Sequence, residues 1–366
     1  MRVALVHPYS WPAVRRGGER YLHDLAGWLT AAGHEVDVLT GEHEGVASGR
    51  TQAGRIVTLP VRTPSRLASH GASALDTFGV SVLPTLARER YDVVHSLIPS
   101  GAVAAAMTVT PSVYTALGHP SPANPPVRRW SRELFAAAMR FARVPAALSD
   151  SAAKGVEGLT GVRPQVLPPG VHTHRFDPDL RARTGPPRLL FNAFAGDPRK
   201  RLRVLLQAMP LVLTQLPDAR VVLGGGGDPA PELDALEPGV RRDVEAVIDD
   251  LGVGTLDDVP GRYRDATVSV LPSVDEAFGL VLVESLACGT PVVCSRSGGM
   301  PEIVTGDDVG RVVTPDDPAA LARGVVEAVQ LAADPATPSR CLDAARPWDW
   351  AVVGPRHELL YGLARA

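Results

Sequence analysis

The sequence predicts an α/β protein with two doubly wound, Rossmann-like domains and a cleft between them. Short β-branched, apolar runs of strand length alternate with helical patterns in both halves of the chain. Between the halves, residues 172–187 end in Thr-Gly-Pro-Pro, a composition typical of a linker. The length of 366 residues and the hydrophobic fraction of 45% suit two sizeable cores.

The first half opens with a βαβ unit. Residues 2–6 and 35–39 are expected strands, and apolar side chains recur at helical spacing between them. Gly17 and Gly18 lie at the start of that helix and fit either a tight turn or a close approach of the backbone to a phosphate or sugar. The dinucleotide fingerprint is not present. Further strands are expected at 55–59, 92–96, 112–115, 146–149 and 166–171, and a basic amphipathic helix, with either a solvated or a lipid-facing polar side, at 127–143.

The second half repeats the alternation. Strands are expected at 188–192, 219–223, 266–271 and 292–294, with a helix at 201–215 and another that opens at Phe278-Gly279-Leu280. Gly289-Thr290-Pro291 ends this second helix. The tail from residue 348 to residue 366 is a last expected helix.

Two carboxylates flank the start of the helix at residue 278. Glu276 lies in the preceding loop, and Glu284 is expected about two turns inside the helix. Unpaired amides at a helix start suit a diphosphate, and carboxylates accept hydrogen bonds from sugar hydroxyls. The combination suits a nucleotide sugar. Taken alone, however, two Glu residues near a helix start favour a plainer interpretation, in which Glu284 only caps or pairs on a half-buried helix.

The longer string is more specific, and it resembles the donor-site signature of retaining glycosyltransferases of family 4, which share the GT-B fold. That signature has two Glu residues separated by seven positions, Phe-Gly after the first, a small-Gly-x-Pro-Val strand and a Gly-Gly-x-x-Glu loop. The resemblance covers nearly the full length. The matching residues here are Glu276, Phe278-Gly279, Glu284, Cys288 to Val292 and Gly298-Gly299-Met300-Pro301-Glu302.

The resemblance implies a GT-B architecture with an interdomain cleft and a C-terminal crossover helix. The expected domains are residues 1–171 on the acceptor side and 188–346 on the donor side. Residues 172–187 would link them, and residues 347–366 would pack back on the first domain. The implied function is retaining transfer of a sugar from a nucleotide-diphosphate sugar, expected to be UDP- or GDP-linked, to an acceptor hydroxyl. The acceptor would be a small molecule or a glycan.

The resemblance also assigns roles to residues. Glu284 would hold ribose hydroxyls, Glu276 the hydroxyls of the sugar, and the amides at Phe278, Gly279 and Leu280 a phosphate. Gly17 and Gly18 would face the cleft, and the backbone near Leu256 would face the base. Lys200, with Arg199 beside it, would stabilise the leaving diphosphate. In the front-face mechanism usually proposed for such enzymes, the leaving phosphate itself takes the proton of the acceptor.

Two positions depart from the family pattern. Phe194 stands about where a strand-end Arg is usual, so Arg199 or Arg201 is a candidate substitute. In the first domain, Leu117 stands at the usual His position, and His119 lies two residues further on. Either His119 takes over that role or the role is vacant.

Composition and charge exclude several other classes of function. The net charge of −3 gives no basic field for nucleic acid, and no Cys/His cluster has metal-site spacing. Neither a metal nor another cofactor is expected. The three cysteines have no spacing typical of a disulfide framework, and the first expected strand begins directly at the N-terminus. The sequence also has no apolar run of membrane length. These features predict a cytoplasmic protein with peripheral membrane contact at most.

Two rival functions belong to other classes. One is a GT-B-like sugar-nucleotide epimerase, which needs acid/base carboxylates and His in the cleft. The other is a sugar-nucleotide-binding protein with weak catalysis, which Phe194 and Leu117 favour. A donor-hydrolysis assay separates the second from an active transferase.

Overall fold

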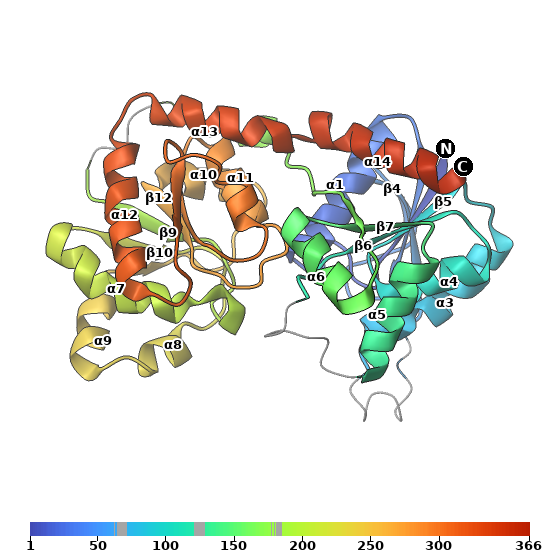
Figure 1. Cartoon of the computed structure of the whole chain (residues 1–366), viewed down its shortest axis with the longest axis horizontal. Coiled ribbons are helices and arrows are strands. Elements are labelled where there is room, and N and C mark those ends of the chain that lie inside the picture. Colours follow the sequence, from blue (N-terminus) through green and yellow to red (C-terminus); the bar gives the residue numbers. More distant parts are fainter. Residues whose placement is uncertain (62, 64–71, 121–128, 177, 179, 181–184) are drawn as a thin grey trace. The chain divides into compact units, whose positions relative to one another are not determined.

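The computed structural model describes residues 1–61, 63, 72–120, 129–176, 178, 180 and 185–366 of the chain. These residues form two compact units. Unit 1 comprises Met1–Gly170 with Trp350–Ala366, and unit 2 comprises Val171–Asp349. Each unit holds one mainly parallel sheet with helices packed against it (Figure 1). No helix in the described ranges is long and apolar enough to cross a lipid bilayer.

The sheet of unit 1 has the strand order β3-β4-β2-β1-β5-β6-β7-β8. All neighbours pair in parallel except β3 and β4, which form an antiparallel hairpin. The chain runs outward from β1 to β2 and β4 on one side, and from β5 to β8 on the other. The strands are β1 (Arg2–Val6), β2 (Glu35–Gly41), β3 (Gly49–Thr51), β4 (Gly54–Leu59), β5 (Val93–Ser96), β6 (Ser112–Ala116), β7 (Val144–Ala147) and β8 (Gln165–Val166).

Helices cover both faces of this sheet because neighbouring strand residues point to opposite faces. Val94 joins a buried cluster with α3 and α4, whereas the next residue, His95, bonds to Tyr361 of α14 at 2.8 Å. The helix α14 packs beside α1. The helices of unit 1 are α1 (Gly17–Ala31), α3 (Ala74–Arg88), α4 (Pro99–Met107), α5 (Arg129–Phe141), α6 (Asp150–Thr160) and α14 (Trp350–Arg365).

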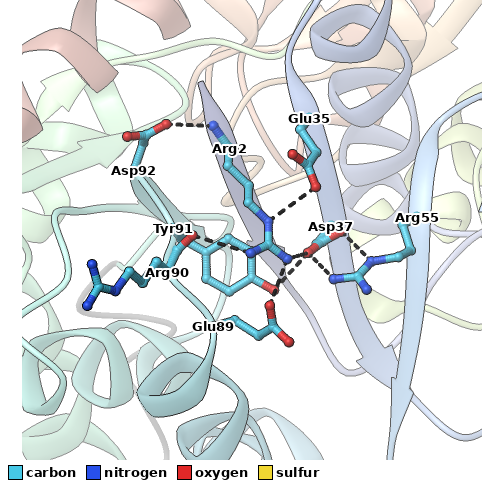
Figure 2. Close-up of polar contacts among 8 residues, drawn as sticks. All are labelled: Arg2, Glu35, Asp37, Arg55, Glu89, Arg90, Tyr91 and Asp92. Atoms are coloured by element: carbon cyan, nitrogen blue, oxygen red, sulfur yellow. Dashed lines mark hydrogen bonds and ion pairs between the residues drawn. The ribbon is translucent and has the colours of Figure 1, made fainter.

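An ion cluster around the buried Asp37 joins strands β1, β2 and β4 (Figure 2). The Asp37 side chain is 1% exposed and accepts hydrogen bonds from Arg2, from Arg55 and from the hydroxyl of Tyr91 at 2.9 Å. Burial alone raises the pKa of Asp37, but the hydrogen bonds from Arg55 and Tyr91 outweigh it and hold the pKa below its ordinary value. The cluster lies at the start of β1, at the sheet edge opposite to the Gly17-Gly18 turn, so we interpret it as structural.

Unit 2 repeats the architecture with six parallel strands in the order β11-β10-β9-β12-β13-β14. The helices α7 and α12 pack together, and α10 and α13 pack on α11. The strands are β9 (Arg188–Phe191), β10 (Arg220–Leu223), β11 (Ile248–Asp250), β12 (Val268–Leu271), β13 (Val292–Ser295) and β14 (Gly310–Val313). The helices are α7 (Leu202–Gln215), α8 (Ala230–Asp234), α9 (Pro238–Glu245), α10 (Asp258–Asp265), α11 (Leu280–Ala287), α12 (Pro318–Ala332) and α13 (Thr337–Ala345).

The predicted architecture of two doubly wound α/β units is confirmed. Some local boundaries differ from the structure. The strand expected at 166–171 is only the pair Gln165–Val166, since the prolines that follow cannot donate to a ladder. The helix expected to open at Phe278 begins at Leu280, which places Glu284 little more than one turn inside it. Residues 127 and 128 of the expected basic helix lie outside the described residues.

Candidate active site

The loops after β9 and β12 meet at the carboxyl edge of the sheet in unit 2. From β9 the chain proceeds to β10 and β11, and from β12 it proceeds in the opposite direction to β13 and β14. Such a switch point leaves a crevice at the carboxyl ends of the strands, where open α/β sheets bind their ligands. Lys200 comes from the first loop and Glu276 from the second. Their Nζ and Oε2 atoms are 2.7 Å apart, and both side chains are about one-fifth exposed, at 20% and 22%.

A short 3-10 turn, Pro198–Lys200, holds Lys200 and Arg199 in place. Asp197 caps this turn by accepting a hydrogen bond from the amide of Arg199 at 3.0 Å. The same carboxylate binds the Arg199 guanidinium at 2.7 Å. Burial alone raises the pKa of Asp197, but its bonds with Arg199 prevail and hold the pKa below the ordinary value. Arg199 therefore carries a partner of its own, in addition to lying next to Lys200.

Arg201, the third basic residue of this run, has a different partner. Its backbone adopts the left-handed conformation with φ of 55°, which directs the chain into α7. Its guanidinium pairs with Asp316 at 2.7 Å. Of the two substitutes suggested for the missing Arg at Phe194, Arg199 is the one that interacts electrostatically with Glu276, the partner of Lys200. Phe194 itself is 55% exposed and lies against Gly196 and Gly227.

The Gly298-Gly299 turn fixes the backbone of Glu276. The amide of Gly299 donates to the carbonyl of Glu276 at 2.9 Å. Gly298 has φ of 59°, and a Cβ at that position would lie 2.0 Å from the same carbonyl oxygen. Any other residue at 298 would push Glu276 away from Lys200, so the glycines of the Gly-Gly-x-x-Glu loop have a steric reason to be there.

A buried hydrogen-bond chain orients Glu284. The hydroxyl of Tyr263 donates to its Oε2 at 2.9 Å, and Asn192 Nδ2 donates to the same hydroxyl at 2.8 Å. Burial and the neighbouring carboxylate raise the pKa of Tyr263 well above its ordinary value, so the phenol remains a donor. Glu284 is 7% exposed on the otherwise apolar helix α11. A carboxylate in such surroundings has its position set by Tyr263 rather than by water.

The remaining predicted donor-side residues lie at the start of α11 and in the turn before α10. Gly279 is the N-cap of α11 with φ of 111°, and Leu280 is the first residue of that helix. The ring of Phe278 is buried against Trp348, with centroids 5.1 Å apart, which leaves its backbone for a ligand. Leu256 is half-buried in the turn before α10, and the carboxylate of Asp258 holds this turn by accepting a hydrogen bond from the Thr255 amide at 2.8 Å.

In unit 1, Gly17 and Gly18 lie at the equivalent place, after β1 and at the start of α1. The strand order reverses between β1 and β5, so this is the switch point of the first sheet. A Cβ on Gly18 would lie 2.9 Å from the Leu117 side chain. Leu117, at the position of the usual His, therefore packs on the glycine turn. His119 lies nearby in sequence and bonds through Nε2 with Ser151 at 2.9 Å.

Sequence reasoning missed Tyr263, Asn192 and Glu19 as members of these sites. Glu19 is 4% exposed in the first turn of α1, and burial raises the pKa of its carboxyl. Perturbed carboxyls of this kind concentrate at functional sites. The sequence Gly-Gly-Glu at residues 17–19 is the local pattern that could have indicated Glu19. Tyr263 and Asn192 carry no local signal, because their roles come from contacts with residues 21 or more positions away.

The described residues contain no group of three or more His, Cys, Asp or Glu side chains placed to hold a metal ion. Two cationic side chains, Lys200 and Arg199, lie in the loop after β9.

Comparison with known proteins identifies families for both halves. The family model described as Glycosyltransferase Family 4 matches residues 15–175, and the model described as Glycosyl transferases group 1 matches residues 186–330. The phosphatidyl-myo-inositol mannosyltransferase of Propionibacterium freudenreichii subsp. shermanii is 29% identical over 393 residues, which cover 100% of this chain and 95% of that relative.

A second relative is the GDP-mannose-dependent alpha-(1-6)-phosphatidylinositol monomannoside mannosyltransferase of Mycolicibacterium smegmatis. It is 34% identical over 227 residues, which cover 55% of this chain and 56% of that relative. Among solved structures, sucrose-phosphate synthase from Thermosynechococcus elongatus superposes with a TM-score of 0.81 at 21% identity. That match covers 99% of this chain and 98% of the synthase and shows a shared fold.

Proposed function

Because this chain is a glycosyltransferase that belongs to family 4 and has the GT-B fold, we propose that it is a retaining hexosyltransferase. It would move a sugar from a nucleoside-diphosphate sugar to a hydroxyl of an inositol-containing lipid. The observation that carries the donor side is the Lys200–Glu276 pair at the switch point of unit 2, with Glu284 held on the adjacent helix.

Each part of the nucleotide-sugar donor would contact the protein group that suits its chemistry. Glu284 accepts hydrogen bonds from the ribose hydroxyls, and the amides at the start of α11 bind a phosphate. Glu276 accepts from hydroxyls of the sugar. Lys200 has three N–H donors, so its ammonium can keep Glu276 and still bind the diphosphate. One ion pair thereby connects the sugar to its leaving group.

Transfer breaks the bond between the anomeric carbon and the diphosphate oxygen and forms a bond from the acceptor oxygen to the same carbon. The leaving diphosphate gains negative charge, which Lys200 offsets as it develops. The proton of the acceptor hydroxyl passes to the leaving phosphate oxygen on the same face of the sugar, so the anomeric configuration is retained. No metal is required in this scheme, because protein cations and the helix start supply the positive charge.

The acceptor and donor proposals are supported by the relatives. The full-length relative is a phosphatidyl-myo-inositol mannosyltransferase, and the partial one is GDP-mannose-dependent. GDP-mannose is therefore the first donor to test and phosphatidylinositol the first acceptor, with UDP sugars as the alternative. Contact with membrane would then be peripheral, at the surface that presents the lipid.

A thermal-shift panel of UDP, GDP, ADP and dTDP with their sugars tests the donor side. A ligand that binds only the folded chain raises the unfolding midpoint in proportion to its saturation. We expect GDP and GDP-mannose to raise it in a concentration-dependent way. If none of the nucleotides shifts the midpoint, the donor assignment fails.

Two observations favour a second candidate, a sugar-nucleotide-binding protein with slow turnover. Phe194 replaces a usual cation with an exposed aromatic ring, and Leu117 packs on Gly18 at the position of a usual His. Mass spectrometry of reactions with GDP-mannose and phosphatidylinositol separates the two. A mannosylated lipid supports the transferase, whereas bound donor without product or hydrolysis supports the second candidate.

A further inference from the structure

The first turn of α1 holds a carboxyl group to which the scheme above gives no role. Glu19 is 4% exposed, although acidic side chains are seldom buried unless they are paired. It directly follows Gly17 and Gly18, so it lies at the switch point of the sheet in unit 1. Open α/β sheets bind their ligands at this edge, and Glu19 is therefore buried where a ligand is expected.

The Glu19 carboxylate has no side chain as a hydrogen-bond partner in the described part of the chain. The Nε atom of Arg20, the next residue, lies 2.6 Å from Asp24. Arg16, the N-cap residue of α1, is exposed and acts on Glu19 only through its charge. The carboxylate does bond with the amide of Glu19 itself. Since a carboxylate can accept about four hydrogen bonds, most of its capacity is unused.

The carboxylate of Glu19 is nevertheless accessible. Some side-chain atoms of the described residues are both enclosed and without a partner, such as the Ser273 hydroxyl, but the oxygens of Glu19 are not among them. The oxygen that does not bond with the amide therefore reaches the surface and provides part of the 4% exposure. A ligand at the glycine turn can contact this oxygen.

The side chain that usually provides a His near this turn is absent. Leu117 stands at that position, and a Cβ on Gly18 would lie 2.9 Å from it. His119, two residues further on, bonds through Nε2 with Ser151 at 2.9 Å. Glu19 is thus a polar group that the turn itself brings to the place left by the His.

We propose that Glu19 binds the acceptor, with its carboxylate accepting hydrogen bonds from neighbouring hydroxyls of a polyhydroxylated ring. The inositol ring of the proposed lipid acceptor has such hydroxyls, so this inference rests on the proposed function. Few water molecules compete at a buried carboxylate, which strengthens these bonds. Glu19 orients the acceptor, and the proton of the attacking hydroxyl still passes to the leaving phosphate.

The alternative role for Glu19 is capping of α1, because a carboxylate in the first turn stabilises a helix. Here burial outweighs the bond to the amide and the charge of Arg16, and it raises the pKa of Glu19 above 4.5. The stability linked to a raised carboxyl pKa is complete below pH 4.5 and is lost as the pH rises through the folded-state pKa. At neutral pH the ionised Glu19 therefore destabilises the fold, the opposite of what capping would do.

Isothermal titration of the full chain with myo-inositol 1-phosphate and with cyclohexyl phosphate tests the proposal. The second ligand keeps the ring and the phosphate but has no hydroxyls. We expect the wild type to bind the inositol phosphate about tenfold or more tightly, the effect of hydrogen bonds to a charged group. Glu19→Ala should abolish this preference. Glu157→Gln, at a surface carboxylate paired with Arg163, is the control and should keep it.

Thermal unfolding without ligand provides a second readout, which separates acceptor binding from capping. Glu19→Gln should have a higher unfolding midpoint than the wild type at pH 8, and the difference should shrink toward pH 5, where the wild-type carboxyl takes up its proton. A residue that only caps α1 would give a lower midpoint in Glu19→Gln at pH 8.

Three results would overturn the proposal. They are equal binding of both ligands by the wild type, a preference for the inositol phosphate that persists in a folded Glu19→Ala variant, and a lower midpoint of Glu19→Gln at pH 8. The nucleotide-induced thermal shift and the mannosylated lipid report on the proposed function separately. If the wild type gives both but any of the three results is found, the role of Glu19 alone is rejected. If it gives neither, the proposed function is rejected.

Discussion

Lys200 and Glu276 neutralise each other across the switch point of unit 2 at a separation of 2.7 Å. Each is about one-fifth exposed, so their attraction is moderated by water and does not lock them together. A diphosphate brings more negative charge than one carboxylate. In the proposed scheme the ammonium binds the diphosphate through one N–H while another N–H keeps the bond to Glu276, which still has oxygen lone pairs for the sugar hydroxyls.

Replacing Lys200 with Ala tests this role. An interaction that strengthens in the transition state lowers the barrier, whereas one equal in both states only aids binding. We expect kcat to fall by about 10² to 10³, as for loss of one donor to a developing anion, and KM for the donor to change less. Arg199→Ala should cost less, since its guanidinium is already bound by Asp197. Steady-state kinetics of both variants measure these effects, with circular dichroism as the folding control. A near-normal kcat in Lys200→Ala would show that Lys200 does not stabilise the leaving group.

Tyr263 provides a second test at the same scale. If its hydroxyl orients Glu284 toward the ribose, Tyr263→Phe should weaken nucleotide binding about tenfold and reduce the preference for the nucleotide over its 2′-deoxy analogue. Tyr114→Phe removes a hydroxyl from a buried tyrosine in unit 1 and is the control. A Tyr263→Phe variant that is less stable but keeps the full ribose preference would show a purely structural role.

The sequence allowed individual site residues to be named, but it did not predict which side chains bond with one another. Glu276, Glu284 and Lys200 could be named because they belong to recognisable strings. The Lys200–Glu276 pair joins residues 76 positions apart, and the Tyr263–Glu284 bond joins residues 21 apart. Such contacts depend on the packing of whole strands and helices.

Among the elements, α14 is anchored by histidines that the fold keeps neutral. His357 Nε2 bonds with the Tyr21 hydroxyl of α1, and His95 Nδ1 bonds with the Tyr361 hydroxyl of α14, each at 2.8 Å. The two rings lie 6.1 Å apart. Burial lowers the pKa of His357 from 6.5 to about 4, and burial followed by the nearness of His357 lowers that of His95 well below 6.5.

This anchoring should weaken in acid. The unfolded chain binds protons near pH 6.5 and the folded chain only near pH 4, so stability is complete above pH 6.5 and declines as the pH falls toward 4. For His357 alone the loss between pH 7 and pH 5 is about 2 kcal/mol. Hydrogen exchange of the α14 amides at pH 5, 6 and 7 (corrected for intrinsic rates) measures it. His357→Gln should give a shallower dependence, and an identical dependence in both proteins would contradict the account.

Element prediction succeeded where hydrophobic periodicity is strong and failed where it is weak. The central strands β1, β9 and β12 are apolar and buried, and their positions were predicted. In contrast, β3 is three exposed residues, Gly49–Thr51, whose strand character comes only from pairing with β4. The start of α11 was placed two residues early because Gly279, with φ of 111°, delays the helix.

For the whole molecule, the architecture could be predicted because both halves repeat the same alternation of strands and helices. The chain belongs to a family that shares this fold, so the fold explains the framework and the side chains at its switch points explain the proposed chemistry. The acceptor could not be predicted, because the loops that follow the strands of unit 1 show no periodic pattern.

Turnover is expected to survive removal of divalent metal ions. Lys200, Arg199 and the start of α11 provide the positive charge that the leaving diphosphate needs. Initial rates in EDTA should match those in Mg²⁺ or Mn²⁺ within about twofold, a change too small for loss of a group that stabilises the leaving charge. A rate that collapses in EDTA and returns with either ion would show that a metal carries the diphosphate instead.

The central claim is that the switch point of unit 2 is a nucleotide-sugar site in which Glu284 holds the ribose. Isothermal titration of the wild type, Glu284→Ala and the exposed-site control Glu237→Ala, with the nucleotide that the thermal-shift panel selects, tests it most directly. We predict that Glu284→Ala weakens binding about tenfold to a hundredfold, the effect of losing a hydrogen bond to a charged group, and that Glu237→Ala binds like the wild type. A folded Glu284→Ala variant with unchanged affinity would contradict the account.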